Sequence, residues 1–247
     1  MASSTLSSRR VALQVRDRVA NGGERLWRLE DFRDLPFAAV AQALSRMTRA
    51  GSVQRLSKGT YYRARPTAFG ASKPNPAALR ELASRERPVF PSGAAAANAL
   101  GFTTQNPGRR EVATSAASLP RKLVGEDTVV HTRRPNAWTE LSESDAALLD
   151  FLRHAGRTSE LSSEDTVERT LKFLRERGRY QRLASVASTE PPRVRALLGA
   201  LGEQLGMNRQ SLGEIRSSLN PLSRFDFGLF SGLPTARAWQ AKEPRQP

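Results

Sequence analysis

Four polar side chains with the chemistry to bind nucleic acid share one face of a predicted helix. Residues Phe37–Ala50 place apolar side chains at i, i+3, i+4 and i+7, which predicts an amphipathic helix with one buried stripe. The stripe consists of Val40, Ala43, Leu44 and Met47. The opposite face carries Gln42, Ser45, Arg46 and Arg49. Amide, hydroxyl and guanidinium groups bond to base edges and phosphates, which favours a nucleic-acid contact over the alternative of a solvated face.

A basic hairpin is predicted directly after this helix. Gly51 is placed to end the helix, and two short strands, 53–56 and 60–63, flank a glycine turn at Ser57-Lys58-Gly59. The candidate phosphate contacts of the hairpin are Arg55, Lys58 and Arg63. Lys58 is the best placed, at the tip. For Arg55 and Arg63 the alternative is an ordinary exposed strand residue, and Arg49 could instead complement the dipole of its helix.

The elements before the helix complete a recognisable order. A first helix is predicted from Ser7 or Ser8 to about Ala20, followed by a short strand at 25–28 and a brief helix at 29–35 anchored by Phe32. Helix, strand, helix, helix and hairpin is the order of a winged helix-turn-helix, whose second paired helix enters the major groove. The sequence therefore predicts a DNA-binding domain over residues 1–66.

The net charge of the chain agrees with a polyanionic partner. It is +15 over 247 residues, and residues 1–70 hold thirteen Lys or Arg against five Asp or Glu, a net charge of +8. The remaining 177 residues carry +7, so the positive charge is concentrated in the predicted binding domain. A bias of base composition is the competing explanation, because 34 of the 39 basic residues are Arg.

The rest of the chain predicts a second, α+β domain over 67–247, after a Pro-, Gly- and Ser-rich linker at 66–76. A helix is expected at about 76–84, and another after Ser92, whose Ser92-Gly93 step is better explained as an N-cap than as an anion site. Short runs at 111–115, 121–124 and 128–133 predict a small antiparallel sheet within about 86–135. Capping boxes and leucine spacing then predict helices within about 141–217.

The sequence lacks the residues that several classes of function require. The chain has no cysteine, which excludes disulfides and thiolate metal sites, and it has no phosphate-loop or nucleophile-elbow motif. His131 and His154 stand without a ligand cluster, so we expect both to be structural and expect no metal, cofactor or catalytic site. There is no apolar run of membrane-spanning length and no apolar core of a secretory leader, so a cytoplasmic, membrane-free protein is expected.

The sequence also resembles the AbiE-type antitoxins of type IV toxin–antitoxin systems, which are transcriptional regulators with an N-terminal winged helix-turn-helix. The matching stretches are ALSRMTRAGSVQRLSKGTYY at 43–62, Phe69-Gly70, PSGAAAANALGFTTQNP at 91–107, and the later VATS and KLVG runs. They fall within about 20–133, roughly half of the chain. The resemblance implies a repressor of its own operon that counteracts a nucleotidyltransferase toxin.

Three functional hypotheses follow. The first is a sequence-specific repressor that binds double-stranded operator DNA, with repeated sites bound by a dimer or cooperatively. The second is a protein-interaction module whose C-terminal helical domain binds a partner such as the toxin. The third, an enzyme, has no catalytic constellation to support it.

Overall fold

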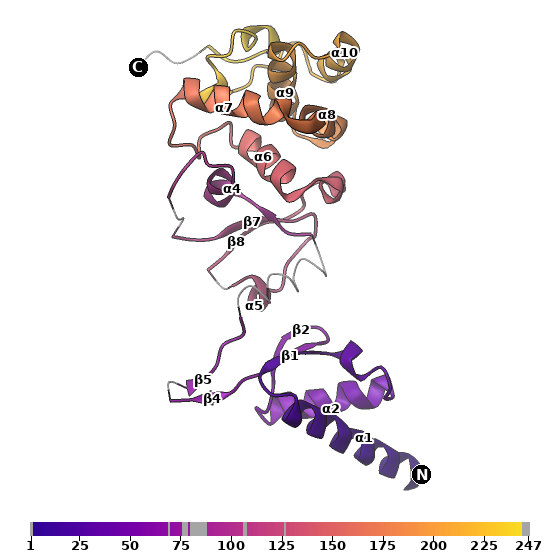
Figure 1. Ribbon diagram of the computed structural model, residues 1–247. Helices are drawn as coiled ribbons and strands as arrows, with labels where there is room; N and C mark the ends of the chain where they lie inside the picture. Colours follow the sequence, from indigo (N-terminus) through magenta and orange to yellow (C-terminus); the bar gives the residue numbers. More distant parts are fainter. Residues whose placement is uncertain are drawn as a thin grey trace. The chain divides into compact units, whose positions relative to one another are not determined.

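The computed structural model describes a mixed α+β protein (Figure 1). The residues it describes are 2–68, 70–75, 79, 88–105, 108–125 and 127–243. Its contacts divide the chain into two compact units: residues 1–86 with 119–126 form unit 1, and residues 87–118 with 127–247 form unit 2. The sequence-based division placed the boundary at 66/67 and assigned all of 119–126 to the second domain. The helix predicted at 76–84 lies outside the described residues, except for Leu79.

Unit 1 begins with two helices that pack on each other. Helix α1 (Ala2–Asn21) contacts α2 (Phe37–Arg49), and strand β1 (Arg25–Arg28) and the 3-10 helix η1 (Leu29–Phe32) lie between them in the chain. The core combines the valine stripe of α1, the predicted stripe of α2 and the aromatic rings of the connection. Its members include Val11, Val15, Val19, Trp27, Phe32, Val40, Ala43, Leu44 and Met47. The predicted start of the first helix at Ser7 or Ser8 was wrong, because helical backbone already begins at Ala2.

A three-stranded antiparallel sheet completes the first half of unit 1. Strands β2 (Gln54–Ser57) and β3 (Thr60–Arg63) form the predicted hairpin, and β1 pairs with the other edge of β3 to give the order β1-β3-β2. Gly51 and Gly59 adopt positive φ values of 73° and 80°, which a glycine tolerates at no steric cost. These two glycines end α2 and turn the hairpin.

The predicted linker contains structure of its own. Strands β4 (Pro66–Thr67) and β5 (Gly70–Ala71) pair antiparallel within residues 66–76. A short helix, α5 (Arg121–Val124), returns from later in the chain and contacts β2. The sequence predicted a strand at 121–124, which was wrong: a β-branched residue in so short a run decides little against tertiary packing.

The sheet of unit 2 is small and mixed. Strands β6 (Phe90–Pro91), β7 (Glu111–Ala113) and β8 (Val129–His131) take the order β6-β7-β8. Strand β6 pairs antiparallel with β7, but β7 pairs parallel with β8. The prediction of an antiparallel sheet was therefore wrong for its second pair. The 15 residues between β7 and β8 pass through unit 1, a connection long enough to return the chain in the same direction.

Helices are layered on this sheet (Figure 1). Helix α4 (Gly93–Ala99) and α6 (Glu143–Arg153) contact the sheet, and α8 and α9 pack on α6. The later helices are α7 (Ser163–Arg175), α8 (Arg179–Ser185), α9 (Pro192–Gln204) and α10 (Arg209–Ser217). The predicted N-caps are confirmed, because Ser142 accepts a hydrogen bond from the Asp145 amide and Ser162 from the Asp165 amide.

The aromatic tail closes the core of unit 2. Phe227, Phe230 and Trp239 are at most 1% exposed and belong to the same hydrophobic cluster as α6 and α9. Gly199 on α9 makes room for the Trp239 ring, since a Cβ there would lie 2.1 Å from it. Among the described helices, none is long and apolar enough to span a lipid bilayer.

Candidate nucleic-acid interface

Helix α2 is held with one face on the core and the other in solvent. Its predicted stripe is buried as expected, because the 3.6-residue period places those four side chains on the α1 side. The side chains of Gln42, Ser45, Arg46 and Arg49 are all exposed. Phe37, the first residue of the helix, is 70% exposed. The four predicted polar residues therefore share one accessible surface, which we call the α2 face.

The hairpin that follows α2 in the chain presents two more exposed cations. Arg55 and Lys58 are exposed, with Lys58 at the turn between β2 and β3. The register shifts between Arg55 and Ser57, and the Nε of Arg55 donates to the Ser57 carbonyl at 3.2 Å. A residue outside the hairpin also holds its turn, because the Leu29 amide donates to the Gly59 carbonyl at 3.1 Å. Lys58 is therefore carried on a defined hairpin.

Arg63 is used differently from the other predicted contacts. It is half-buried, and its Nη1 donates to the Val19 carbonyl at 2.7 Å and also to the Ala20 carbonyl. These are carbonyls of the last turn of α1, which have no partner within the helix and carry its negative dipole end. The guanidinium thus ties β3 to α1, and Arg63 lines a groove together with Arg46 of α2.

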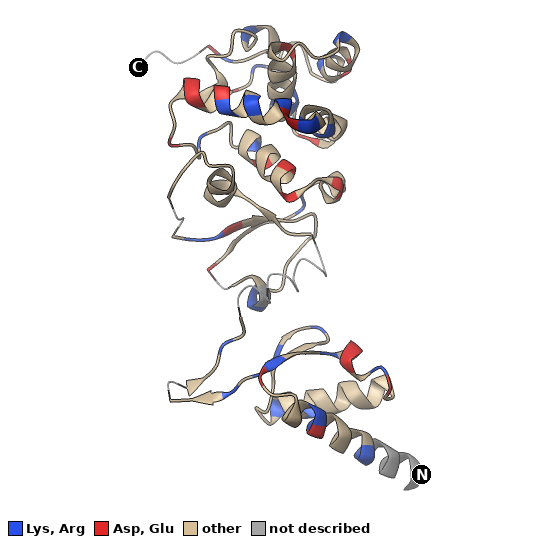
Figure 2. Cartoon of the chain, in the orientation of Figure 1, with Lys and Arg blue, Asp and Glu red and all other residues tan. Residues whose placement is uncertain are grey.

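Four of the five acidic residues described within residues 2–75 form ion pairs, and Asp17 on α1 is in none of these pairs. Figure 2 shows where the acidic and basic residues lie along the chain. The four pairs are Arg18–Asp34, Arg25–Asp31, Arg33–Glu30 and Arg65–Glu24. None of these four pairs uses Arg46, Arg49, Arg55 or Lys58. The cations outside these four pairs include those of the α2 face and the hairpin, together with Arg9, Arg10 and Arg16 on α1.

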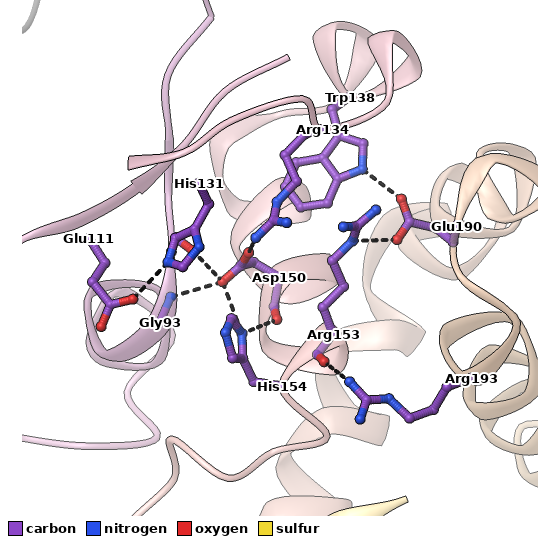
Figure 3. Close-up of polar contacts among 11 residues, drawn as sticks. Gly93, Glu111, His131, Arg134, Trp138, Asp150, Arg153, His154, Glu190 and Arg193 are labelled. Carbon is purple, nitrogen blue, oxygen red and sulfur yellow. Dashed lines mark hydrogen bonds and ion pairs between the residues drawn. The ribbon is translucent and has the colours of Figure 1, made fainter. Parts of the chain in front are cut away.

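A second polar cluster lies in the core of unit 2 around Asp150 (Figure 3). The Oδ2 of Asp150 accepts from the Ser92 hydroxyl at 2.9 Å and from the Gly93 amide at 2.8 Å. Its Oδ1 accepts from Arg134 at 2.8 Å, and the Nδ1 of His154 lies 3.3 Å from Oδ2. The Asp150 side chain is fully buried, so α4, α6 and the segment after β8 meet at one carboxylate.

These contacts keep Asp150 charged. Burial by itself raises the pKa of the carboxyl, but hydrogen bonds from His154 and the Gly93 amide, with the charges of His154 and Arg134, outweigh burial and lower the pKa. The hydrogen bond to Asp150 raises the pKa of His154 above its ordinary value, against the effect of burial. Asp150 is thus a buried carboxylate that pairs with Arg134 and His154 and also accepts hydrogen bonds from Ser92 and Gly93.

The two histidines, each expected from the sequence to be structural, lie close to each other. Their rings meet edge to face at 6.2 Å, and the Nε2 of His131 lies 2.9 Å from the Glu111 carboxylate. Only the i, i+4 spacing of Asp150 and His154 signals this cluster in the sequence. Ser92 stands at the predicted N-cap position, but its side chain makes no cap hydrogen bond, because its hydroxyl donates to Asp150. Within the described residues, no group of three or more His, Asp or Glu could hold a metal ion.

A neighbouring network joins α6 to the start of α9 (Figure 3). Glu190 is 3% exposed and accepts from the Trp138 indole at 2.7 Å and from the Nε of Arg153 at 2.6 Å. Arg193 in turn donates to the Arg153 carbonyl. Because each buried charge has a partner, this cluster also supports packing of the helical layers.

Comparison with known proteins adds little to this description. No protein-family model matches the chain, and no curated protein matches it. The chain is similar to the crystal structure of the RV2827C protein from Mycobacterium tuberculosis, at a TM-score of 0.42 and 20% sequence identity, over 91% of this chain and 86% of that one. Similarity at this level assigns neither a fold family nor a function.

Proposed function

We propose that the protein is a DNA-binding transcriptional repressor whose unit 1 acts as a winged helix-turn-helix. The observation that carries the proposal is the α2 face, with Gln42, Ser45 and Arg46 exposed beside a hairpin that has Lys58 at its tip. In this arrangement α2 enters the major groove and the β2–β3 hairpin is the wing that follows the backbone.

The side chains divide into two kinds of contact. Gln42 and Arg46 have the paired donors and acceptors that read base edges, glutamine at adenine and arginine at guanine, and Ser45 bonds to either. Arg49, Arg55 and Lys58 neutralise phosphates, which adds affinity without sequence preference. Arg63 contributes indirectly, by holding β3 and the end of α1 together.

Two copies are expected on the operator. One α2 face covers a single half-site, and repeated or palindromic half-sites one helical turn apart are read by two such helices. The second copy arrives either as a preformed dimer or cooperatively on the DNA.

The antitoxin role is proposed from the resemblance to AbiE-type antitoxins over 43–62 and 91–107. On this proposal the protein represses its own toxin–antitoxin operon and counteracts a nucleotidyltransferase toxin. Co-expression with the product of the adjacent gene tests it: rescue of growth by the full chain supports the role, and persistent growth arrest contradicts it.

The DNA-binding proposal is tested by selecting sites from random duplexes and measuring their affinity by fluorescence anisotropy. Gln42→Ala and Arg46→Ala are expected to reduce discrimination between the selected and scrambled duplexes, by about 5- to 150-fold for each lost base contact. Lys58→Ala is expected to weaken binding to both duplexes and to reduce the slope of log K against log[salt] by about 0.9. If all three variants bind like the parent, the proposal is wrong.

A second candidate function, binding of a partner protein by unit 2, is favoured by a groove on α7. The groove has a volume of about 510 Å³, an apolar lining that includes Val167, Leu171 and Leu229, and a rim with Glu164 and Glu168. An apolar floor with a polar rim is the anatomy of a protein interface. Co-purification of a partner in high salt without nucleic acid, abolished by Val167→Glu but not by Gln42→Ala, would support this function.

A further inference from the structure

A basic groove lies within unit 1 on the β2 side of the hairpin. It has a volume of about 1210 Å³ and is lined by the end of α2, strand β2, the β4–β5 segment and α5. Strand β2 is an edge strand of its sheet, so one side of it faces the groove. The groove thus brings together three stretches that lie far apart in the sequence, 48–56, 64–79 and 121–125.

Specific hydrogen bonds hold the β4–β5 segment at this place. The Ser72 amide donates to the Arg65 carbonyl at 2.9 Å, and the Arg65 amide donates to the Ser72 hydroxyl at 2.7 Å. The hydroxyls of Ser72 and Tyr62 are 2.9 Å apart, and Tyr62 donates to Glu24 at 2.6 Å. Since Tyr62 belongs to β3, the base of the β4–β5 hairpin is fastened to the sheet. These hydrogen bonds fix the position of Ser72, and Lys73 is the next residue in the chain.

The charge of the lining is of one sign. Arg55, Lys73, Arg121 and Lys122 line the groove, and none of its described lining residues is acidic. Four cations along one groove attract a polyanion and repel a basic segment. Gly51 and Gly70 leave open space where a side chain would project, so a backbone can approach closely.

The groove is continuous with the proposed DNA surface. Arg55 belongs both to the hairpin and to the groove, and Thr48 and Gly51 at the end of α2 line it. We infer that the groove binds the phosphodiester backbone of the duplex that the α2 face reads, with Lys73 and Lys122 as additional phosphate contacts. The inference rests on the proposed function and extends it, because it adds a sequence-distant segment, 121–125, to the DNA-binding surface.

The test is the salt dependence of DNA binding by the full chain. The double variant Lys73→Gln/Lys122→Gln removes two exposed cations of the groove and leaves the core of unit 1 in place. The slope of log K against log[salt] on a duplex is expected to fall by about 1.8, which corresponds to an affinity loss of about 60-fold at 0.1 M salt. The loss is expected to be equal on selected and scrambled duplexes, because phosphates carry no sequence.

A matched control has the same charge change elsewhere. Lys172→Gln/Arg175→Gln removes two exposed cations from α7 in unit 2 and is expected to leave the slope unchanged. Circular dichroism of both double variants checks that they fold. A smaller slope for the groove variant alone supports the inference.

The outcomes separate this inference from the function on which it rests. If the groove variant keeps the slope of the parent while Lys58→Ala lowers it, the groove inference is overturned and the proposed function stands. Equal losses in the groove and α7 variants also overturn it, since net charge alone would then explain them. If the parent binds no duplex at low salt, the proposed function fails and the groove inference fails with it.

Discussion

Replacement of Asp150 by Asn is the sharpest test of how unit 2 is held together. The substitution preserves shape but removes the charge that Arg134 and His154 face, and it places an NH₂ group among donors. The carboxylate is fully buried and accepts from Ser92, Gly93 and Arg134 at 2.8–2.9 Å. An amide has one acceptor oxygen for these donors, so at least one donor loses its partner.

The expected cost follows from this geometry. Breaking a buried ion pair by removing one partner costs about 3–5 kcal/mol. Arg134 is 14% exposed and regains some hydration, which favours the lower end of that range. A loss of about 3 kcal/mol is a large share of the 5–15 kcal/mol that typically stabilises a domain. We therefore expect Asp150→Asn to shift the unfolding midpoint of unit 2 strongly.

Urea unfolding followed by tryptophan fluorescence measures this loss. The chain has three tryptophans, and in a Trp27→Phe background the signal comes from Trp138 and Trp239 in the core of unit 2. The matched control is Asp165→Asn, the same change at an exposed carboxylate in the first turn of α7, with an expected loss below about 1 kcal/mol.

A double-mutant cycle identifies the source of the loss. Arg134→Gln in the Asp150→Asn background should cost less than in the parent, with a coupling energy of about 1 kcal/mol or more. Equal losses for Asp150→Asn and Asp165→Asn, or additive effects of the Asp150 and Arg134 changes, would refute the description of Asp150 as the hub of this network.

Three further predictions concern other contacts. The pKa of His154 in the folded state is raised above 6.5, so its ion pair adds stability that is complete below pH 6.5 and is lost as the pH rises through the raised value. Denaturation from pH 6 to 9 should therefore show the free energy of unfolding falling with pH in the parent and not in His154→Gln. Arg63→Gln should raise amide hydrogen exchange in the last turn of α1, where the bonds to two carbonyls are lost, and unchanged exchange there would contradict the cap. Gly199→Ala should destabilise unit 2 by about 1–3 kcal/mol because its methyl meets the Trp239 ring, whereas Gly213→Ala, which meets open space on α10, should be neutral or stabilising in the same thermal melt.

Elements with a strong local signal were predictable from the sequence. Helix α2 has a complete apolar period, the hairpin has a glycine turn, and α6, α7 and α9 have caps or a first-turn proline that fix where they begin. In each of these the deciding interactions lie within a few residues along the chain. The predicted spans of α2 and of the hairpin strands therefore agree with the observed ones to within one residue, and α6 and α7 begin at the predicted caps.

Elements decided by distant contacts were not predictable in this way. Residues 121–124 have a strand-like composition but form α5 against β2, and the parallel pairing of β7 with β8 depends on the route of the chain through unit 1. The cluster at Asp150 gathers residues from α4, β7, β8 and α6, so only its Asp150–His154 pair is local. Sequence periodicity does not predict which distant residues come into contact.

The charge of unit 1 shows why both the sequence and the structure are needed to describe the candidate site. A count of residues 1–70 gives +8 but treats all thirteen cations alike. In the structure four arginines are neutralised by nearby acids, and Arg63 is used by the end of α1. The cations on the α2 face and hairpin are joined by Lys73 and Lys122 along the groove. Because none of these four pairs uses a cation of α2 or of the β2–β3 hairpin, a DNA duplex that approaches α2 and β2 meets positive charge there, and Arg9, Arg10 and Arg16 on α1 carry further positive charge.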